Sequence, residues 1–83
     1  MTRQEVLEKT KKVIHDCFPD MDVEALREES VINTETAIDS MGFVLVICKL
    51  EALFDVRIPE RQWSKLSTLG DVVDALYKRV EKR

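Results

Sequence analysis

Asp39 and Ser40 stand where an acidic, polar segment gives way to a long apolar run that begins at Met41. This position indicates the N-terminus of a helix, because Asp and Ser side chains accept hydrogen bonds from the free N–H groups of a first turn. The same N–H groups and the positive end of the helix dipole attract anions. A phosphodiester on Ser40 would therefore be stabilised there, although for the pair alone a simple helix cap is the commoner interpretation.

A wider pattern surrounds the pair, and it consists of Met41, Val44, Leu50-Glu51, Phe54, Val56 and Ile58-Pro59-Glu60. In these residues and their spacing the chain resembles the acyl carrier protein family, including its peptidyl and D-alanyl carriers, over essentially the whole length. In that family an Asp-Ser-Leu-like tripeptide opens the second helix, and its serine carries a 4′-phosphopantetheine arm. The resemblance implies that Ser40 is the attachment residue, assisted by Asp39, and that the cofactor is covalent 4′-phosphopantetheine from coenzyme A.

The resemblance also implies a function that is not enzymatic. A carrier would hold an acyl or aminoacyl group as a thioester on the arm and deliver it between partner enzymes. The implied partners are a phosphopantetheinyl transferase, an acyl or aminoacyl ligase and acyl-transferring enzymes. The sequence itself agrees, because no residue pair supplies a nucleophile together with its base.

Three alternatives stay open. The first is an aminoacyl or D-alanyl carrier with a dedicated ligase, since Ser40-Met41-Gly42 resembles the Ser-Phe-Gly of D-alanyl carriers more than the Ser-Leu-Asp of fatty-acid carriers. The second is an unmodified helical module that docks a partner through its apolar second helix. The third is a small hydrolase or redox protein that uses Cys17 or Cys48.

Composition limits the possible classes of protein. Eighty-three residues make one small domain, which we assign to residues 1–83, and 45% hydrophobic with 35% charged residues is typical of a globular fold. Two glycines and two prolines are few for a many-stranded β-domain and favour helices. A net charge of −3 argues against a nucleic-acid partner. Without a long apolar span or a signal peptide, we expect a cytoplasmic monomer with no membrane insertion.

The two cysteines are expected to be buried free thiols. Cys17 and Cys48 lack CxxC spacing, and His15 is the only histidine, so a metal site is not predicted. His15 and Cys17 lie two residues apart, which places them on different sides of a helix. A catalytic Cys–His pair is therefore a poor hypothesis.

The fold predicted from these patterns is all-α, a small antiparallel bundle of three main helices plus one short helix, like that of acyl carrier proteins. The first main helix spans residues 2–17, with Thr2 and Glu5 in a capping box and Pro19 behind its end. The last begins after Thr68, which forms a second capping pattern with Asp71.

Between them, residues 20–39 form a long acidic loop with a short turn near residues 23–27, and Ile38 is a candidate staple for the next helix. The connector 55–59 is expected to turn Val56 and Ile58 inward. A short helix over residues 60–65 follows Pro59, and Trp63 is expected to cover the core.

The second main helix, residues 40–54, departs from the family pattern. Val44, Ile47, Leu50 and Phe54 are taken as its core face. Fatty-acid carriers place acidic residues along this helix, whereas here the only charges from Met41 to Phe54 are Lys49 and Glu51. The apolar remainder either covers the core or forms a docking patch beside Ser40. The candidate partner-binding residues are Met41, Gly42, Val44, Leu45 and Cys48.

Overall fold

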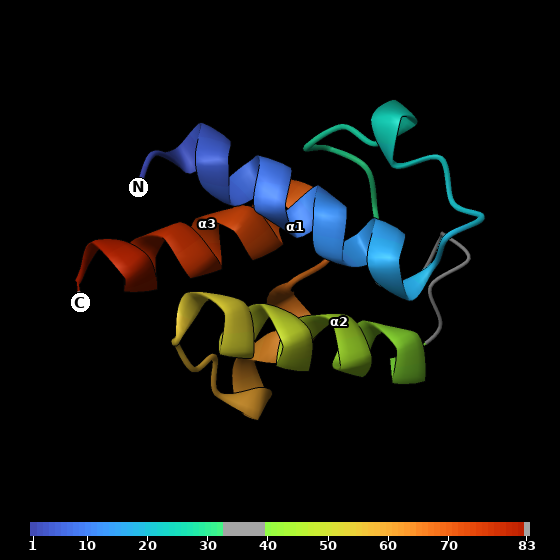
Figure 1. The fold of residues 1–83 in the computed structure, drawn as a ribbon. Coiled ribbons are helices and arrows are strands. Elements are labelled where there is room, and N and C mark those ends of the chain that lie inside the picture. The colour runs from blue at the N-terminus through green and yellow to red at the C-terminus, as the bar shows by residue number, and fades with distance from the viewer. Residues whose placement is uncertain (33–39, 83) are drawn as a thin grey trace.

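The computed structural model of the chain describes residues 1–32 and 40–82. In this part of the chain three α-helices and two short 3₁₀ helices follow one another: α1 (Arg3–Cys17), η1 (Val23–Ala25), α2 (Ser40–Phe54), η2 (Glu60–Lys65) and α3 (Leu69–Glu81). Figure 1 shows α1 running in one direction and α2 and α3 running back in the other. The predicted all-α antiparallel bundle is confirmed.

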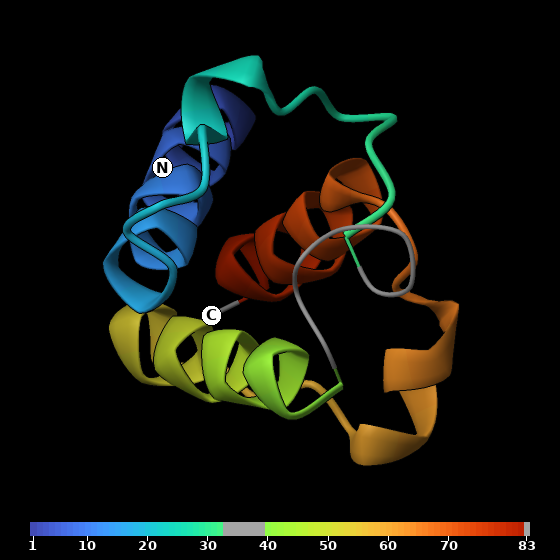
Figure 2. The ribbon, with the colours of Figure 1, turned by 90° about the vertical axis from the view of Figure 1, so that its right-hand side faces the viewer.

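The three α-helices enclose one core. Figure 2 shows how they are arranged around it. Helix α1 packs against both α2 and α3. The core is aliphatic apart from two phenylalanines, and its buried members are Val6, Val13, Ile14, Ile32, Phe43, Val46, Ile47, Leu50, Phe54, Ile58, Leu66, Leu69, Val72, Val73 and Leu76. Thr10 is the buried polar member, and its hydroxyl donates to the carbonyl of Val6 at 2.7 Å, so its burial leaves no unsatisfied donor.

Both predicted capping boxes are present. The hydroxyl of Thr2 accepts the N–H of Glu5 at 3.1 Å, and the Glu5 carboxylate accepts the N–H of Thr2 at 3.0 Å. Thr68 and Asp71 repeat the arrangement at the start of α3, with both distances 3.1 Å. Each box satisfies two N–H groups that lack a partner within the helix, and this fixes where α1 and α3 begin.

The polar loop after α1 is tied to the start of α3 by backbone hydrogen bonds. The N–H of Leu69 donates to the Ser30 carbonyl at 2.9 Å, and that of Gly70 to the Glu28 carbonyl at 2.8 Å. In the other direction, Ile32 donates its N–H to the Ser67 carbonyl at 2.9 Å, beside an isolated bridge between Val31 and Thr68. With the capping box, these bonds satisfy all four N–H groups that the first turn of α3 leaves free.

Arg3 joins three parts of the chain at this anchor. Its Nη2 donates to Oε1 of Glu28 at 2.6 Å, and its Nε donates to Oδ1 of Asp74 on α3 at 2.8 Å. The Arg3 hydrogen bond lowers the pKa of the Glu28 carboxyl. Arg3 thereby links α1, the loop and α3, a role that the sequence analysis did not predict.

The C-terminal end of α2 is closed by a left-handed residue. Asp55 has a φ of 55°, and the N–H of Val56 donates to the Glu51 carbonyl at 3.1 Å, which is the backbone pattern of a Schellman motif. The Glu51 carboxylate accepts the N–H of Ile58 at 2.7 Å, and Trp63 Nε1 donates to the Ile58 carbonyl at 2.9 Å. These bonds hold the connector against α2.

The predictions for the connector and η2 are mostly confirmed. Ile58 is buried, and Val56 and Trp63 pack partly buried against the core, so Trp63 does cover it. The short helix over residues 60–65 is a 3₁₀ helix, and Pro59 stands directly before its first residue. The predicted turn after Asp22 is η1. The staple proposed for Ile38 lies outside the described residues.

Replacing Gly70 by Ala should destabilise the fold, although Ala normally favours a helix over Gly by about 1 kcal/mol. A Cβ at this position would lie 3.1 Å from the Glu28 carbonyl oxygen, which is backbone and is held there by the Gly70 N–H itself. We expect a net loss of roughly 1 kcal/mol in chemical denaturation, in the range of other overpacked sites. Lys78→Ala, on the exposed side of α3, is the control with little effect. A higher melting temperature for Gly70→Ala would show that the loop is not held closely.

Stability should depend on the charge of Asp71 at low pH. The backbone N–H of Thr68 and then that of Ser67 lower the pKa of this carboxyl in the folded protein. Its contribution to the free energy of unfolding is therefore present above the ordinary pKa of about 4 and is lost as pH falls through the lower, folded value. Asp71→Asn should therefore be less stable than the parent at neutral pH, and the difference should shrink below about pH 4. Thermal melts from neutral pH to pH 3 measure it, with Glu24→Gln on η1 as control. A difference that does not change with pH would contradict the assignment.

Candidate attachment site at the start of α2

Ser40 is the first residue of α2, where the sequence placed it. Asp39 lies outside the described residues, so its predicted role is not tested. The first turn of α2 contains no acidic residue, whereas Glu5 and Asp71 occupy the first turns of α1 and α3. A helix of fifteen residues has a full dipole, and no carboxylate of its own first turn competes for an anion at its positive end.

The core face of α2 differs from the predicted one at Val44. Phe43, Val46, Ile47, Leu50 and Phe54 are buried, whereas 40% of Val44 is exposed. The prediction for Val44 was wrong. Phe43 stands three residues before Val46 and four before Ile47, so it fits helical core spacing as well as Val44 does, and the larger phenylalanine takes the core position. Phe43 and Val46 are the buried residues of α2 that the sequence reasoning missed.

The opposite side of α2 carries an exposed apolar row. Met41 is 81% exposed, Leu45 46% and Leu53 51%, and Cys48 is also exposed, while Gly42 is half-buried. These side chains do not cover the core, which leaves the docking patch as the hypothesis that agrees with their exposure. Leu53 was missed, although it lies eight residues after Leu45 and therefore on the same side of the helix.

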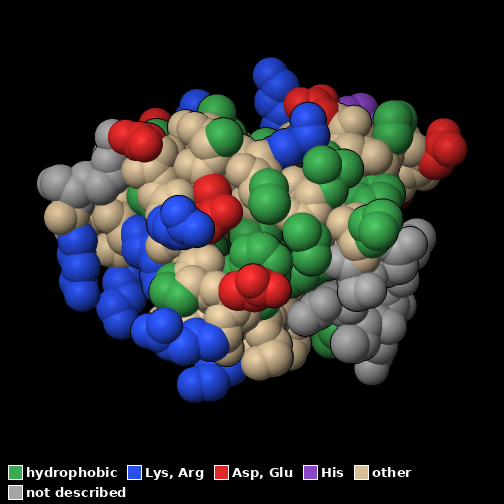
Figure 3. Space-filling view, turned by 90° about the horizontal axis from the view of Figure 1, so that it is seen from below, with side chains coloured by type: hydrophobic (Ala, Val, Ile, Leu, Met, Phe, Trp, Pro, Cys, Tyr) green, Lys and Arg blue, Asp and Glu red, His purple; other side chains and the backbone are tan. Residues whose placement is uncertain are grey.

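Charge on this helix is sparser than its sequence suggests. Of its two charged residues, Glu51 is turned to the connector, where it accepts the N–H of Ile58. Lys49 is the charged side chain of α2 that is exposed. The exposed side of α2 is therefore apolar with one cation. Figure 3, which views the molecule from the α2 side, shows apolar side chains across the middle of this face.

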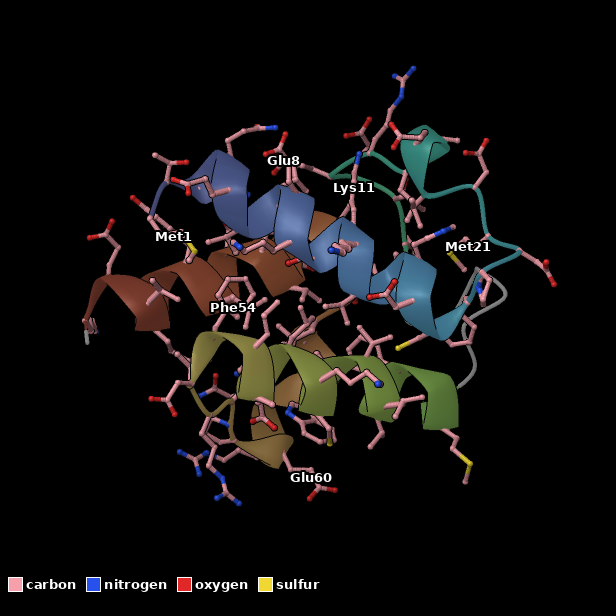
Figure 4. The ribbon with its side chains drawn as sticks, in the orientation of Figure 1. Met1, Glu8, Lys11, Met21, Phe54 and Glu60 are labelled. Atoms are coloured by element: carbon pink, nitrogen blue, oxygen red, sulfur yellow. The ribbon has the colours of Figure 1, made fainter. Side chains whose placement is uncertain are left out.

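A shallow hollow lies beside this row, between α1 and α2. It has a volume of about 260 Å³ and is lined by Lys9, Lys12, Val13, Asp16 and Leu53. Figure 4 shows the side chains of α1 and α2 that meet along this seam. A larger groove of about 550 Å³ lies on the far side of α1, against η1, and its polar lining includes Glu8, Lys11 and His15.

The two cysteines differ from the prediction of two buried thiols. Cys17 is half-buried and free, and burial raises the pKa of its thiol. Cys48 is free and exposed, so the prediction was wrong for this residue. Within residues 1–32 and 40–82 no group of three or more His, Cys, Asp and Glu side chains could hold a metal ion. Over the same ranges no helix has the length and apolar character that crossing a membrane requires.

Comparison with known proteins decides the family. The chain is 34% identical to the acyl carrier protein of Thermosynechococcus vestitus over 80 residues, which is 96% of this chain and 98% of that protein. The chain belongs to the acyl carrier protein family. The acyl carrier protein of Clostridium acetobutylicum is 32% identical and covers 93% of the chain, with 99% of its own length matched. A comparison with models of protein families finds no match.

A solved structure supports the same conclusion. That of the acyl carrier protein from Enterococcus faecalis superposes with a TM-score of 0.78 at 29% identity, covering 95% of this chain and 99% of that one. Members of this family are carriers and not enzymes, so the chain has a carrier role and the hydrolase and redox alternatives fall away.

The two thiols of this carrier should react at different rates in the folded protein. Cys48 is exposed, whereas burial hinders access to Cys17 and disfavours its thiolate, the reactive form. We expect a disulfide reagent to label Cys17→Ser, which keeps Cys48, several times faster than Cys48→Ser. Mass spectrometry over time measures this, and labelling in denaturant is the control in which both rates converge. Equal rates in the folded state would contradict the described burial.

Proposed function

We propose that the Ser40 hydroxyl of this carrier bears 4′-phosphopantetheine, and that residues 1–83 act together as one cytoplasmic carrier domain. The observation that carries the proposal is the position of Ser40 as first residue of α2, in a chain that matches acyl carrier proteins over nearly its whole length. When attached, the group supplies a thiol on a long arm, which holds an acyl or aminoacyl cargo as a thioester.

The residues around Ser40 fit such a group. The dipole at the start of α2 favours a phosphodiester, and the first turn adds no carboxylate that would repel it. Gly42 has no side chain that could crowd the arm. Asp39 is proposed to assist modification, either as a helix cap or by helping to hold the Mg²⁺ of the modifying enzyme.

The exposed apolar row of α2 is proposed as the docking surface for partner enzymes. Its members are Met41, Leu45, Cys48 and Leu53, and the exposed Val44 beside them extends the surface. Met41 lies next to Ser40. Exposed apolar side chains in a row are a common sign of a protein interaction site. The partners are a phosphopantetheinyl transferase, a ligase that loads the arm and the enzymes that accept the cargo.

The test is the intact mass after incubation with coenzyme A, Mg²⁺ and a broad-specificity phosphopantetheinyl transferase. The parent should gain one phosphopantetheine, and Ser40→Ala should gain none. Ser64→Ala, which removes an exposed serine of η2, is the matched control and should be modified like the parent. No gain in the parent with several transferases, on protein shown to be folded and unmodified at the start, would leave the unmodified docking module as the better proposal.

The cargo is a separate question, and an acyl group is the first candidate because the relatives are acyl carrier proteins. The absence of exposed acids on α2 and the Gly42 that follows Met41 favour the aminoacyl alternative. Loading the modified protein with acyl and with aminoacyl ligases, followed by intact mass, separates the two.

A further inference from the structure

A cluster of cations lies at the far end of α2 from Ser40. Arg57 on the connector and Arg61 on η2 are exposed. Arg79 of α3 joins them, because its Nε donates to the Arg57 carbonyl at 2.9 Å and its Nη2 donates to the side chain of Gln62 at 2.9 Å. Figure 3 shows Lys and Arg side chains gathered toward one edge of the apolar α2 face.

The side chain of Arg79 makes its hydrogen bonds to neutral groups. The groups that accept the Arg79 N–H bonds are the carbonyls of Arg57 and Ala75 and the amide of Gln62, none of which carries charge. The ion pairs among the described residues are those of Arg3, at the other side of the fold. Three acids lie nearby, Glu51, Asp55 and Glu60. With the exposed Lys65 of η2 added to the three arginines, this end of the surface keeps a small net positive charge.

The side of the α2 face that borders α1 also carries more cations than acids. Lys49 is the exposed charge of α2 itself, and the hollow beside Leu53 is lined by Lys9 and Lys12 against one acid, Asp16. On its α1 side and at its C-terminal end, the α2 face therefore presents apolar side chains bordered by more cations than acids. Complementary charge at the rim of an interface steers association and selects the partner.

We infer that the enzyme surface which docks on α2 has an apolar centre and carboxylates that meet Arg57, Arg61 and Lys49. The inference deepens the proposed function, because it names the chemistry of the partner at the proposed docking surface. A protein partner is favoured over an anionic membrane because the arginines gather at one end of the face, where a local acidic patch fits, whereas a lipid surface spreads its charge evenly.

The test uses unmodified protein and two synthetic amphipathic peptides of about 16 residues, each with the same row of leucines at helical spacing. One peptide has Glu beside the leucines and the other has Lys. Backbone amide shifts of isotope-labelled protein report affinity and place the contact. We expect the Glu peptide to bind on α2 and η2 roughly tenfold more tightly than the Lys peptide, and the preference to fade from about 0.15 M to about 1 M salt.

Variants separate the two parts of the surface. Arg57→Glu and Arg61→Glu should each weaken binding of the Glu peptide by roughly three- to tenfold, as expected for a reversed surface charge. Arg27→Glu, an exposed arginine of the loop, is the matched control and should leave it unchanged. Leu45→Ser should weaken both peptides. Thermal melts check that every variant is folded.

Several results would overturn the inference. They are a Lys peptide that binds as well as the Glu peptide, no binding of either, an equal effect of Arg27→Glu, or binding to anionic phospholipid vesicles without preference between the peptides. Because Ser40 is unmodified throughout, the result is independent of the mass experiment. Modification at Ser40 without this preference would remove only the inference, and the preference without modification would leave an unmodified docking module.

Discussion

The structure depends on the first turn of α3, where four backbone N–H groups need partners that the helix cannot supply. The Thr68 hydroxyl and the Asp71 carboxylate satisfy two of them, and the carbonyls of Ser30 and Glu28 satisfy the others. The loop is thus fastened to α3 by bonds that α3 itself requires. Arg3 reinforces the arrangement, since it reaches Glu28 and Asp74 from α1. In a chain of this size, with few glycines and a largely aliphatic core, such a junction orders a segment that has little apolar surface of its own to bury.

That junction also bears on the carrier role. The loop leaves it at Ile32, which is buried in the core, and α2 begins at Ser40. A carrier has to present one residue to a succession of enzymes without a change of its own fold in each complex. A bundle whose helices are fixed by capping boxes and a common core meets this need, and chemistry by its own side chains is not required. The comparison with acyl carrier proteins agrees with a carrier role for this bundle.

Local patterns predicted most of the elements, and long-range contacts account for what was missed. Thr2 with Glu5 and Thr68 with Asp71 are signals contained in a few neighbouring residues, so the starts of α1 and α3 could be predicted. The choice between Phe43 and Val44 as core residues depends on how α2 is rotated against α1 and α3, which an almost uniformly apolar helix does not encode. The same ambiguity misplaced Cys48. The backbone bonds from the loop to α3 leave no side-chain pattern at all, and Arg3 looked like any exposed cation until its two partners, 25 and 71 residues away, were known.

The closed end of α2 has a geometric consequence. Asp55 in the left-handed region, the Glu51 carboxylate on Ile58 and the Arg79 bonds to Arg57 and Gln62 prevent the last turn from fraying. Helix α2 is then a rod of fifteen residues, about 22 Å long, held firmly at the end opposite Ser40. An enzyme that binds the far end thereby sets the position of the near one, so the proposed attachment residue would keep a fixed place relative to the docking surface. Helix α2 would thus fix the distance between the docking surface and Ser40, and partners would differ only in the direction of the proposed arm.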